Sequence, residues 1–273
     1  MGKGSQVSLE GTGEEMGFSW LTIELTNRCN KSCNFCGRAK IRDKMELGDM
    51  DFDLFKHILK QFNGEIIQFS RDGDPLCYRH FDELSAYMWA YYDDLPVTNI
   101  VTNGKLLLER RNELLNAYTT ITVSVIEEDW EQFNIVKKFK EYVDLNHPII
   151  YVKFLGDYYN PEYEKLGLRT MRRTLHNPEG DWDYQKGQEL LPEIGVCADF
   201  LMKPSINWKG EFFICNRFDP GKKGMIGDVK TQTLDQIWNN EIRQEWLNYH
   251  KIGRRDLVSL CKDCQFWGVP RYK

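Results

Sequence analysis

The chain has 273 residues, enough for one large α/β domain or for a barrel with a small appendage. Its net charge is −5 and it has no long basic run, which excludes unspecific nucleic-acid binding because neutralising phosphates needs clustered Lys and Arg. No run of about 18 apolar residues occurs, so we expect no membrane-spanning segment. Eight cysteines without a secretory signal favour metal or redox chemistry in a reducing compartment, and we expect a cytoplasmic protein.

Short apolar strands alternate with amphipathic helices along the first half of the chain. The strands are predicted at residues 20–25, 65–70, 98–102, 120–126 and 149–155. The helices are predicted after an N-cap at Asp51 and at residues 81–92, 105–117 and 130–143. This alternation predicts parallel strands with right-handed crossovers, whose active sites lie at the carboxyl ends of the strands.

The alternation breaks after residue 156, and a different pattern follows Cys197. Residues 204–215 predict a β-hairpin, and residues 233–246 predict a helix that Thr233 caps. The expected division is a flexible Gly-rich arm at residues 1–19, a barrel domain at residues 20–190 and a small module at residues 191–273.

Three cysteines, Cys29, Cys33 and Cys36, lie within eight positions directly after the first predicted strand. A cluster of four irons normally takes four thiolates, so three would leave one iron open to another ligand. The spacing C-x3-C-x2-C on such a loop resembles the signature of the radical S-adenosylmethionine (radical SAM) enzymes. The resemblance implies that these cysteines hold a 4Fe-4S cluster whose open iron binds SAM, and that Phe35 lies beside the adenine. A zinc site with Cys ligands is the alternative.

Three later segments resemble the SAM-binding segments of the same family. The residues in place of a Gly-Gly-Glu-Pro stretch that binds the SAM amino group are Asp72, Gly73, Asp74 and Pro75. Asp74 keeps a carboxylate that can accept hydrogen bonds from an ammonium group. The resemblance implies further SAM contacts at Asn103, in the sequence TNG, and at Ser124, in the sequence VSV. A strand hydroxyl with a purely structural hydrogen bond is the alternative for Ser124.

Four more cysteines, Cys197, Cys215, Cys261 and Cys264, have the pattern C-x17-C, x45, C-x2-C. This pattern resembles the twitch module, a shortened relative of the SPASM module that follows radical SAM barrels. The resemblance implies a second 4Fe-4S cluster held entirely by the protein, while a structural zinc is the alternative that the spacing permits. Cys77 is left over; we interpret it as a small packed hydrophobe, with donation of a hydrogen atom in catalysis as the alternative.

The resemblance implies an α/β fold, namely a partial (β/α)6 TIM-like barrel with a small C-terminal α+β auxiliary iron–sulfur module. It also implies reductive cleavage of SAM to a 5′-deoxyadenosyl radical that abstracts hydrogen from the substrate, with a flavodoxin or ferredoxin as reductant. A fully ligated second cluster cannot bind substrate without losing a thiolate, so we expect it to accept an electron. The outcome would be a two-electron oxidation by an oxidoreductase-like enzyme; a purely structural second cluster would leave isomerisation or epimerisation open.

Residues rich in hydrogen-bond donors, located between the barrel and the module, are the candidates for substrate binding. They are Arg169, Arg173, His176 and Asn177. Arg217, just after Cys215 in the module, is a further candidate. We expect a small polar substrate such as a sugar, an aminocyclitol or a nucleotide derivative. The alternatives are epimerisation or cross-linking of a ribosomal peptide, isomerisation of a modified nucleoside or amino acid, and a non-enzymatic zinc scaffold. Peptide maturases often carry a leader-recognition domain ahead of the barrel, which we do not expect from the 19 residues before Trp20.

Overall fold

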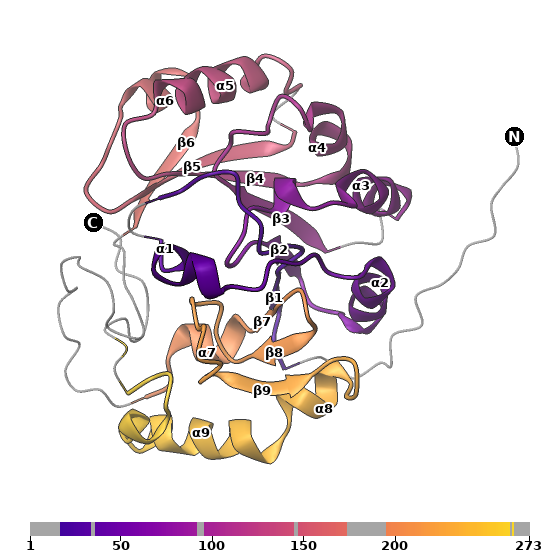
Figure 1. Cartoon of the computed structure of the whole chain (residues 1–273), viewed down its shortest axis with the longest axis vertical. Coiled ribbons are helices and arrows are strands. Elements are labelled where there is room, and N and C mark those ends of the chain that lie inside the picture. Colours follow the sequence, from indigo (N-terminus) through magenta and orange to yellow (C-terminus); the bar gives the residue numbers. More distant parts are fainter. Residues whose placement is uncertain are drawn as a thin grey trace, which may run out of the picture.

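The computed structural model describes residues 17–33, 36–91, 96–144, 147–173, 195–262 and 264, and shows a mixed α/β arrangement (Figure 1). Nine strands of the described residues form one sheet in the order β6-β5-β4-β3-β2-β1-β7-β8-β9. The first six strands pair in parallel, each with the next along the chain. They are β1 (Trp20–Ile23), β2 (Ile66–Phe69), β3 (Val97–Thr102), β4 (Thr120–Val125), β5 (Ile149–Leu155) and β6 (Arg169–Arg173).

Helices that connect these strands lie along the outer face of the curved sheet (Figure 1). They are α2 (Phe52–Gln61), α3 (Phe81–Ala90), α4 (Arg111–Ala117), α5 (Trp130–Lys140) and α6 (Glu162–Lys165), while the short α1 (Arg38–Ile41) follows the first cysteine loop. Among the described residues, no helix has the length and apolar character needed to cross a membrane. The predicted fold class, a partial (β/α)6 barrel followed by a small α+β module, is confirmed.

Local sequence explains the first long helix, α2. The side chain of Asp51 accepts hydrogen bonds from the backbone N–H groups of Asp53 and Leu54, both at 3.0 Å, as an N-cap should. Phe55, Ile58 and Leu59 follow at helical spacing and are buried in the core. The predicted cap and apolar face of this helix are therefore confirmed.

The helix expected from residue 105 begins later, at Arg111 in α4. The side chains of Thr102 and Asn103 accept hydrogen bonds from the backbone N–H groups of Gly104 (3.0 Å) and Lys105 (2.9 Å). Such side-chain-to-backbone bonds offer the chain an alternative to a helical turn. The segment before α4 therefore forms turns, and the predicted start of this helix was wrong.

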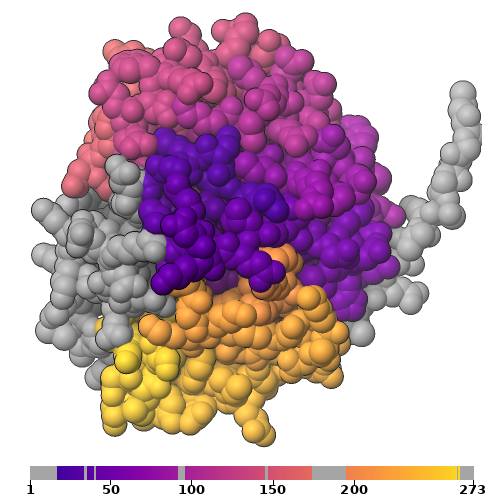
Figure 2. All heavy atoms as spheres, in the orientation of Figure 1, coloured from indigo at the N-terminus to yellow at the C-terminus, as the bar shows by residue number. Residues whose placement is uncertain are grey.

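The C-terminal residues extend the same sheet beyond β1. Strand β7 (Ser205–Ile206) pairs in parallel with β1, and β8 (Glu211–Phe213) pairs with β7 as the predicted hairpin. Gly210 closes the hairpin turn with a φ of +90°, which glycine adopts readily. The remaining elements are α7 (Ala198–Met202), β9 (Met225–Asp228), α8 (Leu234–Trp238) and α9 (Glu241–Lys251). Figure 2 shows this part of the chain (orange and yellow) directly against the first residues of the barrel (indigo).

The single helix expected over residues 233–246 is in fact two helices. Thr233 caps α8 and forms a capping box with Gln236, as its position predicts. Asn240 then accepts a hydrogen bond from the backbone N–H of Arg243 at 2.8 Å and begins α9. Asn is among the best N-cap residues, so the sequence Asn-Asn at this point was the signal for a second start.

The expected N-terminal arm does not extend as far as residue 19. Phe18 is 3% exposed, and its ring centroid lies 4.6 Å from that of Trp238 and 6.1 Å from that of Phe212. It also packs on Phe62 of the barrel. One aromatic side chain at the end of a polar segment therefore anchors the chain between barrel and module.

Candidate active site

The first cysteine loop leaves the carboxyl end of β1. Cys29, Cys33 and Cys36 are all half-buried, and the backbone N–H of Cys36 donates to the carbonyl of Cys33 at 3.1 Å. Loss of solvent raises the pKa of Cys33 to about 11, although the charge of Lys31 acts against this shift. Such a thiol is protonated at neutral pH, so a bound metal must displace the proton to gain a thiolate ligand. Phe35 lies outside the described residues.

Asn103 connects this loop to the end of β3. Its side-chain amide donates to the side-chain oxygen of Asn30 at 2.8 Å and lies 3.7 Å from the sulfur of Cys29. Its backbone carbonyl accepts a hydrogen bond from the side chain of Gln132 at 2.6 Å. The structure thus places this expected SAM contact beside an expected cluster ligand, and the contact with SAM itself stays a prediction.

Asp74, expected to accept a hydrogen bond from the SAM ammonium, is 3% exposed and already holds two loops together. Its carboxylate accepts from the backbone N–H of Leu76 (3.0 Å), the hydroxyl of Thr102 (2.9 Å) and the backbone N–H of Asn103 (2.7 Å). Burial raises the pKa of Asp74, and these donors oppose that rise. The structure therefore gives Asp74 a positioning role, and its contact with SAM stays a prediction.

Gly73 occupies a point where two loops approach closely. A Cβ atom at this position would lie 2.2 Å from the carbonyl oxygen of Thr26 and 2.6 Å from that of Arg28. Any side chain would push the segment around Gly73 away from the loop that carries Cys29. The glycine of this motif therefore holds the expected SAM-binding segment against the first cysteine loop.

Two buried charged residues beside Asp72 were missed by the sequence analysis. Glu24 is 2% exposed and accepts from the backbone N–H groups of Asp72 (3.1 Å) and Trp208 (3.2 Å), so it connects the barrel to the hairpin of the module. Burial, and then the charge of Asp72, raises the pKa of Glu24 to about 7. Arg71 has a φ of +134°, and its guanidinium lies 3.8 Å from the ring centre of Phe213. The signal for Glu24 was a carboxylate inside the apolar run WLTIEL.

Strands β4 and β5 place Ser124 and Lys153 side by side in register. Lys153 forms no ion pair with any residue that the structure describes. Loss of solvent, and then the positive charges of Arg173, Arg217 and Lys203, lower the pKa of Lys153 to about 7. A lysine in such surroundings suits an acid group of a ligand, which would stabilise its charged form. Its signal in the sequence was the single charge in the strand IIYVKFL.

Three of the five candidates for substrate binding lie within the described residues. Arg169 is exposed and donates to the hydroxyl of Tyr151 at 3.2 Å. Arg173 ends β6 on the same face as Arg169, because strand side chains alternate. Arg217 donates to the carboxylate of Asp199 at 2.7 Å in the C-terminal module. The two candidates outside the described residues are His176 and Asn177.

Cys77 ends a short 3-10 turn, Pro75–Cys77, directly after Asp74. It is half-buried, and burial followed by the negative charge of Asp74 raises its pKa to about 12. The side chain is therefore a neutral thiol at neutral pH. A neutral thiol can pack as a small hydrophobe and can also give up a hydrogen atom, so both interpretations stay predictions.

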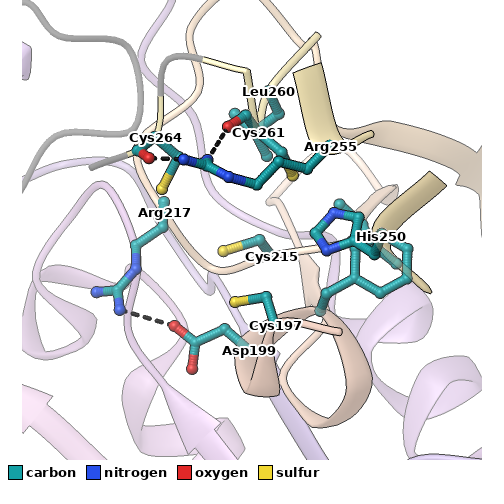
Figure 3. Close-up of a pocket in the computed structure, with 11 residues that line it drawn as sticks. Cys197, Asp199, Cys215, Arg217, His250, Arg255, Leu260, Cys261 and Cys264 are labelled. Atoms are coloured by element: carbon teal, nitrogen blue, oxygen red, sulfur yellow. Dashed lines mark hydrogen bonds and ion pairs between the residues drawn. The ribbon is translucent and has the colours of Figure 1, made fainter. Parts of the chain in front are cut away.

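The four C-terminal cysteines line one cavity with an empty volume of about 420 Å³ (Figure 3). Cys197 lies at the N-cap of α7, and Cys215 follows β8. Cys261 and Cys264 follow the 3-10 turn Arg255–Leu257. Thiols from three separate segments therefore converge on one space, as a site with every ligand supplied by the protein requires.

The other residues around this cavity form an apolar wall with polar pairs behind it. The apolar members are Phe200, Ile214 and Leu260. Arg255 donates to the backbone carbonyls of Cys261 and, at 2.9 Å, of Cys264, so it positions the last two thiols. Loss of solvent raises the pKa of Cys215 and of Cys261 well above the ordinary value. The imidazole of His250 completes the lining.

An iron–sulfur cluster fits the chemistry of this cavity. Thiolates are the ligands that such clusters take, and the apolar wall limits the access of solvent to them. In the described part of the chain, no three His, Cys, Asp or Glu side chains are close enough together to hold a single metal ion. A cluster of several irons holds its thiolates farther apart than one ion does, so the spacing is compatible with a cluster.

Comparison with known proteins agrees with this arrangement. Residues 197–265 match SPASM, an iron–sulfur cluster-binding domain. The chain is 24% identical, over 90% of its length, to the S-adenosyl-L-methionine-dependent 2-deoxy-scyllo-inosamine dehydrogenase of Niallia circulans, 92% of which it covers. The crystal structure of BtrN in complex with AdoMet and 2-DOIA matches with a TM-score of 0.65 and 21% identity, covering 90% of this chain and 92% of BtrN. The structure of Streptococcus suis SuiB bound to precursor peptide SuiA matches with a TM-score of 0.60 and 14% identity, covering 91% of this chain and 71% of SuiB.

The fold, the cysteine sites and these matches define a radical SAM enzyme with a C-terminal SPASM-type iron–sulfur module. The family resemblance and the oxidoreductase-like enzyme class predicted from the sequence are thereby confirmed. Within that class, the chain is similar over almost its whole length to an aminocyclitol dehydrogenase. The SPASM match indicates binding of iron–sulfur clusters, and the dehydrogenase among these relatives depends on S-adenosyl-L-methionine.

Proposed function

We propose that this enzyme removes two electrons from a small polar substrate. Cys29, Cys33 and Cys36 would hold a 4Fe-4S cluster with one iron open to SAM. A second 4Fe-4S cluster would be held by Cys197, Cys215, Cys261 and Cys264. When bound, the first cluster and SAM supply the one-electron chemistry, in which SAM is cleaved to a 5′-deoxyadenosyl radical that abstracts hydrogen from the substrate. The electron left on the substrate would pass to the C-terminal site.

The observation that carries this proposal is a loop with three thiols and a cavity with four thiols, both attached to one sheet. Strand β1 leads into the open loop and pairs with β7, which in turn pairs with β8 before Cys215. Glu24 adds a second connection, because it accepts hydrogen bonds from Asp72 near one site and from Trp208 near the other. A shared sheet keeps the two sites at a fixed separation, which suits electron transfer to the C-terminal site from a substrate radical formed at the N-terminal site.

The chain's own residues would orient SAM and the substrate at the carboxyl ends of the barrel strands. Asn103 and Ser124 offer hydrogen-bonding groups at neighbouring strands, β3 and β4. Asp74 and Gly73 hold the intervening loops in place through the contacts described above. Lys153 would bind a carboxylate of SAM or an acid group of the substrate, since its surroundings otherwise contribute positive charge.

We propose a sugar, an aminocyclitol or a nucleotide derivative as substrate. The support is the similarity, over 90% of this chain, to a dehydrogenase of 2-deoxy-scyllo-inosamine, together with the donors of Arg169, Arg173 and Arg217. The second candidate is epimerisation or cross-linking of a ribosomal peptide, which the likeness to SuiB bound to a precursor peptide favours. Isomerisation of a modified nucleoside or amino acid would be the outcome if the second cluster were purely structural. We propose flavodoxin or ferredoxin as reductant and the cytoplasm as compartment, because the thiols need a reducing environment.

The test is anaerobic reconstitution with iron and sulfide, followed by reduction in the presence of SAM. We expect about eight irons per chain, as two 4Fe-4S clusters require, and release of 5′-deoxyadenosine on reduction. Zinc in place of iron, or fully loaded protein that releases no 5′-deoxyadenosine, would refute the proposal. Deuterium transfer into 5′-deoxyadenosine from labelled sugars, aminocyclitols, nucleotides or peptides would then separate the substrate classes.

A further inference from the structure

His250 is a buried imidazole that the functions above do not use. It lies in the last turn of α9 and is 1% exposed, and its ring packs on that of Phe200 with centroids 4.7 Å apart. Both of its ring nitrogens are buried and have no hydrogen-bond partner in the part of the chain that the structure describes. A neutral imidazole has one N–H donor and one acceptor nitrogen, and a buried donor without a partner loses its hydration with no compensation.

The ring of His250 lines the cavity of the four cysteines (Figure 3). The other polar side chains of the lining are already bonded within the protein. Asp199 accepts from Arg217, and Arg255 donates to the backbone carbonyls of two of the cysteines. The sulfur atoms of this cavity are acceptors that can pair with the N–H of His250.

We propose that His250 donates a hydrogen bond from its ring to a sulfur atom of the auxiliary cluster, and that this bond raises the reduction potential of the cluster. The inference rests on the proposed function, because it requires a cluster in this cavity. Hydrogen bonds to the sulfurs help to set the potential of an iron–sulfur cluster, since they stabilise the more negative, reduced form. The packing on Phe200 fixes the direction of the ring, which is a condition for one well-aligned bond.

A hydrogen bond from His250 bears on the outcome of the proposed reaction. A higher potential makes the C-terminal site a better electron acceptor, so His250 would favour net oxidation over return of a hydrogen atom to the substrate radical.

The test measures the potential of the auxiliary cluster alone. The parent is the full chain with Cys29, Cys33 and Cys36 all replaced by Ala. In this parent, the measured potential comes from the auxiliary cluster. Into this parent we introduce His250→Leu, which removes the donor, and His250→Gln, which keeps one. We expect His250→Leu to lower the equilibrium constant for reduction about tenfold, which is about 59 mV for a one-electron couple, and His250→Gln to recover part of that loss. His57→Leu, the same change at an exposed histidine of α2 that does not line the cavity, is the matched control and should leave the potential unchanged.

An unchanged potential in His250→Leu with full iron content would overturn the inference. A parent without iron in the auxiliary site would refute the proposed function instead, so the two failures are distinguishable. If His250→Leu does not retain a cluster, pulsed EPR of the parent decides. Coupling of the reduced cluster to a histidine nitrogen, identified by ¹⁵N-histidine labelling, together with a coupled proton that exchanges in D₂O, would support the bond; absence of both would overturn it.

Discussion

The two thiol sites of this chain differ in how far the protein has already enclosed them. The N-terminal site (Cys29, Cys33 and Cys36) lies on one half-exposed loop, with the amide of Asn103 beside it. The C-terminal site (Cys197, Cys215, Cys261 and Cys264) lines a cavity with an apolar wall, and Arg255 holds the backbone of its last two thiols. An open site can accept an exchangeable ligand, whereas an enclosed site can exchange only electrons. The proposed function uses this difference, with bond breaking at the N-terminal site and electron acceptance at the C-terminal site.

The largest expected effect is the loss of SAM cleavage when one thiol is removed from the N-terminal site. Cys33→Ala leaves two thiolates, so we expect release of 5′-deoxyadenosine to fall to the background level, because no stable cluster can present an open iron to SAM. The C-terminal site should still load, at about four irons per chain. Iron analysis and chromatography of the reduced mixture measure both quantities. SAM cleavage at the wild-type rate by this variant would contradict the assignment of the open site.

The reciprocal change, Cys261→Ala, should separate cleavage of SAM from oxidation of the substrate. We expect iron to fall to about four per chain and the two-electron oxidised product to disappear, while 5′-deoxyadenosine is still released. The reason is that the N-terminal site is built from other residues, on a loop that follows β1. Oxidised product formed at an undiminished rate would show that the C-terminal site is not the electron acceptor. The melting temperature of the iron-free variant controls for loss of the fold.

Local patterns in the sequence were sufficient to predict most of the strands and helices of the barrel. The alternation of strands and helices, and the caps at Asp51 and Thr233, depend on residues within a few positions of one another, so they can be read from the chain. The start of α4 and the break before α9 were missed because side chains of Asn103 and Asn240 compete for backbone N–H groups. The outcome of this competition depends on local hydrogen-bond geometry, which the spacing of apolar residues does not report.

The candidate ligands could be predicted from the spacing of the cysteines. The site residues that depend on contacts between distant segments could not be predicted. The cysteine pattern predicted a second set of four thiols, and the structure places these around one cavity. The connection from Glu24 to Trp208 joins residues 184 positions apart, and no local pattern reports it. The same holds for Lys153 and His250, whose importance comes from what surrounds them: three cations around one and a thiol-lined cavity around the other.

A change at Gly73 tests whether the N-terminal site depends on close contact between its loops. In Gly73→Ala the new methyl group would meet the carbonyl oxygens of Thr26 and Arg28, which belong to backbone and cannot rotate away. We expect a loss of about 3 kcal/mol of unfolding free energy, at the upper end for overpacking, and weaker SAM binding. Gly167→Ala is the matched control, because nothing lies within 4 Å of its Cβ and only its positive φ costs about 1 kcal/mol. Denaturant unfolding of both variants measures the difference, and equal losses would contradict the close-contact explanation.

The smallest effect is expected at Lys153, whose surroundings include the positive charges of Arg173, Arg217 and Lys203. Its pKa is about 7 in the folded chain and about 10.4 in an unfolded one, so between these values the unfolded chain binds a proton that the folded chain lacks. Stability of the wild type should therefore rise with pH from about 7 toward 10, and Lys153→Met should remove that slope. Because Lys153 is only partly buried, solvent screens most of the penalty that this shift implies, and at pH 7 we expect the variant to be more stable by about 1 kcal/mol, or roughly 3 °C in Tm.

Thermal unfolding of the iron-free chain at pH 7, 8 and 9 measures this effect, with Lys137→Met on the exposed face of α5 as the control. Inorganic phosphate at pH 7 should stabilise the wild type more than Lys153→Met, because an anion compensates the positive charge of the lysine. Parallel pH profiles for wild type and variant would show that Lys153 is solvated and has no special affinity for acid groups. A higher melting temperature of Lys153→Met would show that Lys153 lowers the stability of the fold. That result fits a cation whose role is to bind SAM or the substrate.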